Sequence, residues 1–422
     1  MLLAVYSSDP SRIVAGDTAS YENPARALLA VGRFVSSPEE PARVEMLRTP
    51  GYPAFIAAVY GVSRHSRLAV AIAQIAISTA TLALTFLLAL RLWDISFAWT
   101  AAVVLALDPL SFVYAPLLQS ETLFALAVVL LALAGMAWMR TGAGRHGFFF
   151  GLAAACATLI RPIAYYLFLP ALVFICARQI FAGRPLRRVV AAALLAALPW
   201  MVLVEGWRVR NYVLTGRLEI AQIASVNLAW YRGAGIIATR DRISFWDARE
   251  KMARSLPDTT GWSPGAVSAL YEREGLELIL AHPALFARNE AFGLLKILGG
   301  PGRADLLHYF AGVPYEETPE GAVEVSASSL RQRFSSGGGL ATIPVAYGTG
   351  YLLALYAYLL FALWAIWRHE RPWWVEHAFL WLIVAYLVVM AAGPEAYARF
   401  RVPVMPFLAM YAARGWNAAS HG

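Results

Sequence analysis

Several runs of about 20 consecutive apolar residues restrict the fold of this chain more than any other feature, because a helix of that length crosses the hydrocarbon core of a bilayer. Inside lipid every backbone polar group needs an internal partner, so such runs fold as helices. Apolar runs that fit this description cover residues 67–92, 97–116, 120–139, 147–160, 163–181, 188–206, 341–367, 374–393 and 402–416. We therefore predict an all-α, polytopic transmembrane helical bundle.

The composition agrees with a lipid-facing surface. Hydrophobic residues make up 59% of the chain and charged residues only 15%, whereas a soluble domain carries about 25% charged residues. The net charge of +8 does not indicate nucleic-acid binding, because the arginines lie mainly in short connectors between apolar runs, as the positive-inside rule predicts. Cys156 and Cys176 lie inside apolar runs, which favours buried, inert thiols. The sequence has no Walker loop, dinucleotide fingerprint or zinc-type cluster.

The pattern divides the chain into four segments. Residues 1–66 are expected to form a loop and juxtamembrane helices at the outer face, with a short interfacial helix over 51–63. Residues 67–206 and 341–422 hold the membrane spans. Residues 207–340 are predicted to form a large outer loop with a helical subdomain, whose best helix runs over 264–298, is capped by Ser263 and is broken at His282-Pro283.

Arginine placement predicts the orientation of the bundle. If the spans alternate, Arg140, Arg145, Arg184 and Arg188 lie on one side with most other connector arginines. This side is predicted to be cytoplasmic. The opposite, outer side then holds residues 1–63, the turn before Glu121 and the 207–340 region. Met1–Tyr6 is too short for a signal peptide or a span, which suggests either the remnant of a first helix or a true start that lies upstream.

The predicted topology brings polar residues from distant parts of the sequence to the outer boundary of the bilayer. The candidates for a functional site there are Asp17, Tyr21, Arg48, Tyr52, Asp108, Glu121, Arg161, Arg210, Arg399 and Arg401. Most of them also have a structural interpretation. Asp17 and Asp108 suit helix caps, Glu121 suits a helix N-terminus, and the arginines could contact lipid headgroups.

Taken together, these residues favour a phosphate-linked substrate. Arginine holds phosphate through a fork of donors and keeps its charge at all ordinary pH values. A neighbouring carboxylate can act as general base on an acceptor hydroxyl. This combination explains why both charge signs occur in tight turns on the outer side, where arginine is otherwise disfavoured.

The motifs resemble those of the GT-C superfamily of polyprenyl-phosphate-sugar-dependent glycosyltransferases, especially bacterial family 39, which is similar to protein O-mannosyltransferases and aminoarabinose transferases. The motifs that carry the resemblance are Gly16-Asp17-Thr18-x-x-Tyr21, Arg48-Thr49-Pro50-Gly51-Tyr52-Pro53, Ser120-Glu121-Thr122, Pro199-Trp200 with Arg210-Asn211-Tyr212, His282-Pro283, and Arg399-Phe400-Arg401-Val402-Pro403. Members of this family have a helix before the first acidic loop, and here it is absent or reduced to Met1–Tyr6.

The resemblance implies an inverting transfer of a sugar from a polyprenyl-phosphate donor to a lipid, glycan or protein acceptor. Asp17 would be the general base, Arg48 with Arg399 or Arg401 would bind the donor phosphate, and Glu121 would orient the acceptor or sugar or pair with an arginine. The expected location is the bacterial inner (plasma) membrane, with the site facing the periplasm or exterior. We expect no cofactor, since no ligand cluster supports a divalent cation.

Three other functions are compatible with a polytopic membrane chain. A transporter or flippase of a lipid-linked or anionic substrate is the main alternative, although the spans have no visible repeat. An O-antigen polymerase or ligase would use similar donors but is not expected to carry the Asp17 and Arg48 motifs. A purely structural membrane protein leaves the outer arginines unexplained.

Overall fold

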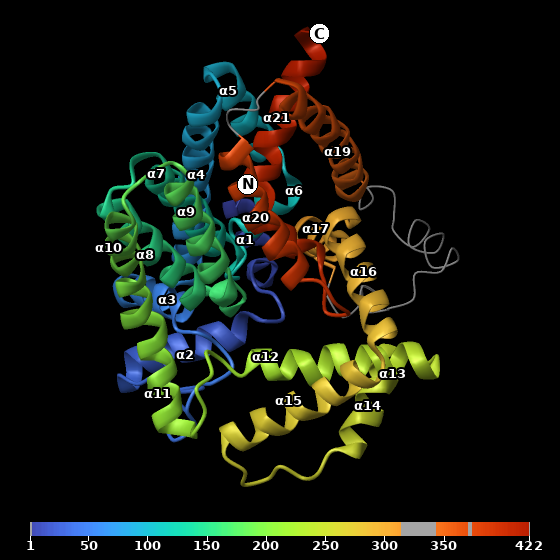
Figure 1. Cartoon of the computed structure of the whole chain (residues 1–422). Coiled ribbons are helices and arrows are strands. Elements are labelled where there is room, and N and C mark those ends of the chain that lie inside the picture. Colours follow the sequence, from blue (N-terminus) through green and yellow to red (C-terminus); the bar gives the residue numbers. More distant parts are fainter. Residues whose placement is uncertain (1, 314–342, 370–373, 422) are drawn as a thin grey trace.

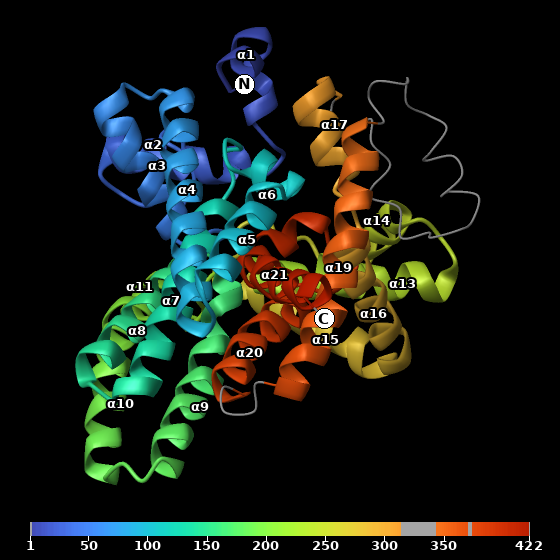
Figure 2. The ribbon, with the colours of Figure 1, turned by 90° about the horizontal axis from the view of Figure 1, so that it is seen from above.

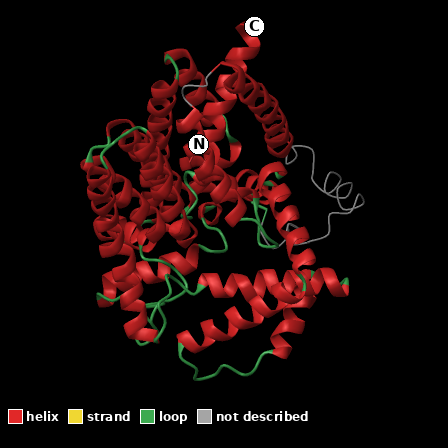
Figure 3. Cartoon of the chain, viewed as in Figure 1, coloured by secondary structure: helices red, strands yellow, loops and turns green. Residues whose placement is uncertain are grey.

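The computed structural model describes residues 2–313, 343–369 and 374–421, and these residues are almost entirely helical (Figure 3). Within the described ranges no strand is present, and the isolated bridge between Val35 and Val44 closes a loop. The predicted all-α class is therefore confirmed. The final part of the predicted outer region, residues 314–340, lies outside the described residues.

The N-terminal segment consists of short helices that do not span a bilayer. They are α1 (Leu2–Ser8), the 3₁₀ helix η1 (Pro10–Ile13), α2 (Thr18–Val31) and α3 (Gly51–Ser63). The predicted helix over 51–63 is present with the same bounds. Gly51 starts α3 directly against the backbone of Leu159, where an added Cβ would lie 2.6 Å from the Leu159 carbonyl oxygen. This close approach fixes the chain that follows Arg48 against the membrane bundle.

The membrane bundle follows the apolar runs, and in Figure 1 helices α7 to α10 stand side by side. Its helices are α4 (Arg67–Leu92), α5 (Ile95–Ala106), α6 (Pro109–Tyr114), α7 (Glu121–Thr141), α8 (Gly144–Ile160), η2 (Pro162–Leu167), α9 (Phe168–Phe181), α10 (Leu186–Trp200), the π-helix η3 (Met201–Glu205) and α11 (Gly206–Thr215). Helices long and apolar enough to cross a membrane are Arg67–Leu92, Glu121–Thr141, Pro162–Phe181, Leu186–Thr215 and Ile343–Trp367.

The predicted span over 97–116 is divided into two helices in the structure. The apolar pattern predicts a single helix over 97–116, but the structure ends α5 at Ala106 and starts α6 at Pro109. Pro109 has no amide hydrogen and disfavours a helical residue before it. Asp108 takes the cap position of α6 and accepts a hydrogen bond of 2.8 Å from the Ser111 amide. The proline therefore divides the apolar run into two short helices.

Small residues allow α8 and α10 to pack closely. Gly147 and Gly151 lie one turn apart on α8, and a Cβ added to them would approach the carbonyl oxygens of Ala192 and Ala196 on α10 to 2.7 Å and 1.8 Å. Small residues spaced four apart let helix backbones approach in membranes, where the gain comes from van der Waals contact. This contact holds α8 in place, and Arg161 follows directly after α8.

The predicted outer subdomain lies across one end of the bundle, where α12, α13 and α15 run across the picture while α7 to α10 stand upright (Figure 1). Its helices are α12 (Ile223–Val226), the π-helix η4 (Asn227–Gly233), α13 (Ala234–Asp241), α14 (Phe245–Ser255), α15 (Pro264–Ala281), α16 (Pro283–Gly299) and α17 (Arg303–Ala311). The predicted helix over 264–298 is present as α15 and α16, broken at His282-Pro283. Ser263 caps α15 as predicted, accepting a hydrogen bond from Ala266.

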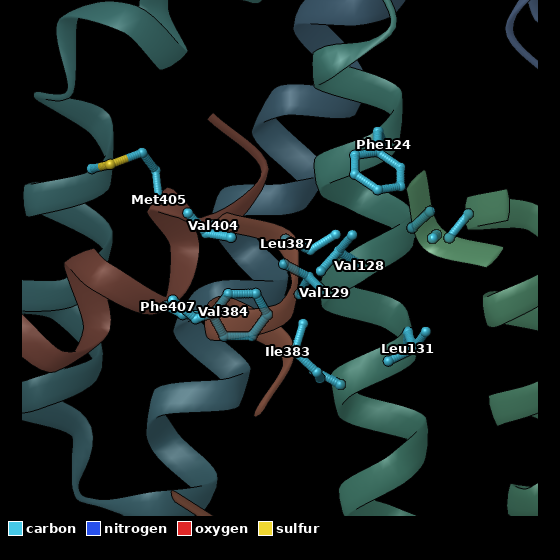
Figure 4. Packing of buried hydrophobic residues seen from close by; sticks show 14 of the residues in the cluster. Phe124, Val128, Val129, Leu131, Ile383, Val384, Leu387, Val404, Met405 and Phe407 are labelled. Carbon is cyan, nitrogen blue, oxygen red and sulfur yellow. The ribbon is translucent and has the colours of Figure 1, made fainter. Parts of the chain in front are cut away.

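The C-terminal helices complete the core. They are α19 (Ile343–His369), α20 (Trp374–Met390), the 3₁₀ helix η8 (Ala398–Val404) and α21 (Met405–His421). Seen from above, α19, α20 and α21 lie beside the membrane helices α5 and α7 (Figure 2). Side chains of α7, including Phe124, Val128 and Leu131, face Ile383 and Leu387 of α20 in a dry cluster (Figure 4). Apolar packing thus fixes η8, which continues into α21, beside the first turn of α7.

We predict that Gly151→Leu destabilises the bundle, because a side chain at this position overlaps the backbone of Ala196. Overpacking in a well-packed contact costs roughly 1–3 kcal/mol, and we expect a lower unfolding temperature for the purified protein in detergent. Gly206→Ala is the matched control, since nothing lies within 4 Å of a Cβ added at Gly206. Equal thermal stability of Gly151→Leu and wild type would contradict the close contact.

Candidate active site

Asp17 lies at the start of α2, and its side chain is not used as a helix cap. The helix begins at Thr18, but the Asp17 carboxylate makes no capping hydrogen bond. The loop is held instead by Thr18, whose hydroxyl accepts a hydrogen bond of 2.9 Å from the Ala15 amide and donates one of 2.9 Å to the Leu118 carbonyl. The carboxylate is therefore left to interact with other side chains.

Two arginines from distant parts of the chain bind the two oxygens of the Asp17 carboxylate. Arg48 Nη2 lies 2.9 Å from Oδ1, and Arg399 Nη2 lies 2.8 Å from Oδ2. Arg48 is fixed further by donating from Nε to the Ser20 hydroxyl at 2.9 Å and from Nη1 to the Tyr21 hydroxyl at 3.1 Å. The predicted convergence of Asp17, Arg48, Tyr21 and Arg399 is thus present in the geometry.

The two arginines keep Asp17 ionised. Burial of the carboxyl group acts to raise its pKa, but Arg399 and Arg48 outweigh burial and hold the pKa of Asp17 well below its usual value of 3.8. A group with this environment carries its negative charge at every ordinary pH. The same contacts make both arginines dependent on Asp17 for charge compensation.

Glu121 extends the cluster as the first residue of α7. Its side chain is 1% exposed, with Oε1 at 2.8 Å from Arg161 Nη1 and at 3.7 Å from Arg399 Nε. Arg399 therefore lies between Asp17 and Glu121. Glu121 Oε2 is buried and has no hydrogen-bond partner among the described residues. Together the two carboxylates and the arginines Arg48, Arg161 and Arg399 leave one net positive charge.

Arg401 lies away from this cluster, although the sequence suggested it as an alternative to Arg399. Its side chain is 1% exposed. Arg401 Nη1 donates to the carbonyl oxygens of Ile297, Leu298 and Gly300 at 2.5, 3.2 and 3.0 Å. In a 3₁₀ helix, residues two apart point in different directions, so Arg399 and Arg401 face different neighbours.

Three further candidates have other partners in the structure. Arg210 donates to the Phe34 carbonyl at 3.1 Å and lies over the Trp207 ring, so it supports the loop between α2 and α3. Tyr52 is fully buried and donates to Gln74 Oε1 at 2.6 Å. Asp108 caps α6 and is also fully buried.

An apolar cavity of about 320 Å³ lies beside the first turn of α7, where Thr122, the residue after Glu121, forms part of its wall. Its wall residues come from α1, α4, α5, α6, α7, α17, η8 and the start of α21, and Asp17, Arg48 and Arg399 are not among them. Within the described residues no group of three or more His, Cys, Asp or Glu side chains is arranged to hold a metal ion. The first turn of α7 thus contributes Glu121 to the charged cluster and Thr122 to the wall of the apolar space.

Two contacts of the site were not anticipated. Ser20 and Ser120 bind Arg48 and Tyr21, respectively, through their hydroxyl groups. Both serines lie inside the motifs around Asp17 and Glu121, and this position is the signal that could have identified them. The pairing of Arg161 with Glu121 depends on the packing of α7 against α8, which sequence spacing does not reveal.

We predict that Asp17→Asn lowers the thermal stability of the protein, because it leaves Arg48 and Arg399 without their shared counter-charge. A carboxyl group with a lowered pKa contributes stability above its unfolded-state pKa of about 3.9, and this contribution is lost as the pH falls. The difference in unfolding temperature between wild type and Asp17→Asn should therefore be constant above about pH 5 and shrink below it. The exposed pair Glu40 and Arg43 provides the control variant Glu40→Gln; a difference that does not change with pH would contradict the ion pairs.

Comparisons with known proteins give one family match and two structural similarities. One similar structure is the archaeal oligosaccharyltransferase AglB from Archaeoglobus fulgidus, solved in complex with an inhibitory peptide and a dolichol-phosphate. Its sequence is 11% identical to this chain, and the TM-score is 0.49. The match covers 95% of this chain and 46% of AglB. ArnT from Cupriavidus metallidurans in the apo state is 13% identical with a TM-score of 0.35 over 99% of this chain and 77% of ArnT. This chain thus spans less than half the length of AglB. No curated protein matches the sequence.

Residues 47–205 match the family model described as dolichyl-phosphate-mannose-protein mannosyltransferase. The matched segment includes Arg48, Glu121 and Arg161 of the charged cluster, whereas Asp17 and Arg399 lie outside it. Over residues 47–205 this family match agrees with the glycosyltransferase resemblance that the sequence motifs carry.

Proposed function

We propose that this protein transfers a sugar from a polyprenyl-phosphate donor to an acceptor hydroxyl at the outer face of the membrane, with inversion at the anomeric carbon. The observation that carries the proposal is the Asp17 carboxylate held between Arg48 and Arg399 at 2.9 and 2.8 Å. The family match over 47–205 supports the reaction class. Asp17 would act as general base, and the lipid phosphate would be the leaving group.

The charge balance of the cluster suits such a donor. A sugar linked through a phosphodiester to a polyprenol carries one negative charge, and the cluster of two carboxylates and three arginines has one net positive charge. When the sugar departs, the lipid phosphate gains a second negative charge. Arginines placed where that charge develops stabilise the transition state.

Donor binding would also change the basicity of Asp17. The phosphate and the Asp17 carboxylate compete for the same Nη2 donors of Arg48 and Arg399. Once the phosphate takes these hydrogen bonds, the cause of the low pKa of Asp17 is weakened and the carboxylate becomes a better proton acceptor. In this mechanism the base becomes active only when the donor is bound.

Two neighbouring features would hold the remaining parts of the substrates. The apolar cavity of about 320 Å³ suits part of an isoprenoid chain, since its walls are mainly aliphatic and aromatic. The buried oxygen Oε2 of Glu121 suits a hydroxyl of the sugar or the acceptor. Arg161 would keep the Glu121 carboxylate oriented through its contact of 2.8 Å with Oε1.

The test is transfer from a panel of radiolabelled polyprenyl-phosphate sugars in membranes that contain the wild-type protein or Asp17→Asn. We expect transfer from at least one donor by the wild type and a loss of about 100-fold or more in Asp17→Asn, as for removal of a general base. Asp94→Asn, at the exposed cap of α5, is the matched control and should keep full activity. A folded Asp17→Asn protein that retains full transfer would overturn the role of Asp17, and movement of the intact lipid-linked sugar across vesicles without transfer would favour a flippase.

A further inference from the structure

A second group of charged residues lies outside the active site, where the outer subdomain meets the segment that carries Arg399. Arg232 of η4 contacts Glu290 of α16 at 3.1 Å and Glu395 at 3.6 Å. Its Nη2 also donates to the carbonyl oxygen of Ala392 at 3.0 Å, just after the end of α20. These side chains are at most one-fifth exposed. Arg232 therefore links η4, α16 and the chain between α20 and η8.

Helix α16 holds the same segment along its length. Gly293 of α16 packs against Gly393 so closely that an added Cβ would lie 2.2 Å from the Gly393 amide nitrogen. Lys296 donates to the Pro394 carbonyl at 3.4 Å. At the other end, Arg401 donates to the carbonyl oxygen of Gly300, directly after α16. Residues 392–401 are thus fixed to α16 on both sides of Arg399.

Unlike Pro394 and Arg401, Arg399 makes its ion pairs with residues outside α16. Its guanidinium group reaches Asp17 and Glu121 at the opposite side of η8. Since Asp17 lies in a loop held by other contacts, the distance between Arg399 and Asp17 depends on how residues 392–401 sit on α16. A shift of about 1 Å in such a group can change a reaction rate by about 100-fold.

We infer that Arg232 and Glu395, together with α16, form a clamp that positions Arg399 for binding the donor phosphate, so that the outer subdomain controls the geometry of the active site. This inference rests on the proposed function for its effect on transfer, whereas the clamp itself is a property of the fold. Arg232 and Glu395 are positioning residues, because they touch neither Asp17 nor Glu121 among the contacts of the structure. In this account Arg401 acts as an anchor of the segment.

The ionisation of Glu395 gives the clamp a dependence on pH. Burial, together with Glu290, raises the pKa of Glu395 to about 7, against the opposing effect of Arg232 and Lys296. These three charged side chains come from η4 and α16, the elements packed against Glu395. As the pH rises through about 7, Glu395 becomes ionised and its attraction to Arg232 increases. The wild type should therefore gain activity relative to Glu395→Gln over this range.

The experiment is a double-mutant cycle between Arg232→Gln and Arg399→Gln, measured as kcat/KM for the donor. Arg232→Gln alone should lower kcat/KM by about 10-fold or more. In the Arg399→Gln background it should have little further effect, because it acts only through Arg399. Glu395→Gln is the second variant, and Arg217→Gln is the control, since Arg217 pairs with Glu272 within the outer subdomain. If Arg232→Gln lowers kcat/KM in the Arg399→Gln background as much as it does in the wild type, the inference is overturned.

Amide hydrogen exchange tests the clamp without any substrate. We expect faster exchange in residues 393–401 of Arg232→Gln and Glu395→Gln than in wild type or Arg217→Gln. Unchanged exchange in both clamp variants would overturn the inference even if the protein transfers sugar. If the wild type transfers no sugar from any donor, the proposed function fails, while faster exchange would still support the clamp.

Discussion

The contact of one carboxylate with two arginines, Arg48–Asp17–Arg399, is the interaction on which the site depends. Arg399 lies 382 positions after Asp17 in the sequence, and only a folded bundle brings them within hydrogen-bond distance. A partly buried carboxylate without partners would be costly, and so would two buried guanidinium groups. Arg48 and Arg399 therefore share Asp17 as a counter-charge, and the contact ties together the first loop, the chain before α3 and η8.

The surrounding helices make this contact possible through close packing. Gly147 and Gly151 bring α8 against α10. Helix α8 also packs against α7, so that Arg161, directly after α8, lies beside Glu121 at the start of α7. On the other side, α16 holds residues 392–401, which places Arg399. The charged cluster thus joins two structural units, the membrane bundle and the outer subdomain. If a donor phosphate replaces Asp17 as the hydrogen-bond acceptor of Arg48 and Arg399, the contacts of both units with the cluster would change.

Much of this arrangement could be predicted from the sequence, because apolar runs and motifs are local signals. Such signals predict the all-α class, the helix break at His282-Pro283 and the Ser263 cap. They also predict that Asp17, Arg48 and Arg399 lie near one another. Hydropathy alone predicted a single span over 97–116, because it does not register a missing amide hydrogen, whereas Asp108 before Pro109 was already a candidate helix cap. The partners of Arg401 and Arg232 depend on how α16 packs, and no periodicity in the sequence encodes this long-range contact.

The most direct measurement is the coupling free energy between Asp17 and Arg399 in the unfolding of the purified protein, obtained from Asp17→Asn, Arg399→Gln and the double variant. Contacting charged residues typically show a coupling of about 0.5–3 kcal/mol, whereas distant residues are additive. We predict that the free energy of unfolding of the double variant is about equal to that of the less stable single variant. Additive losses of stability would contradict the contact and with it the account of the active site.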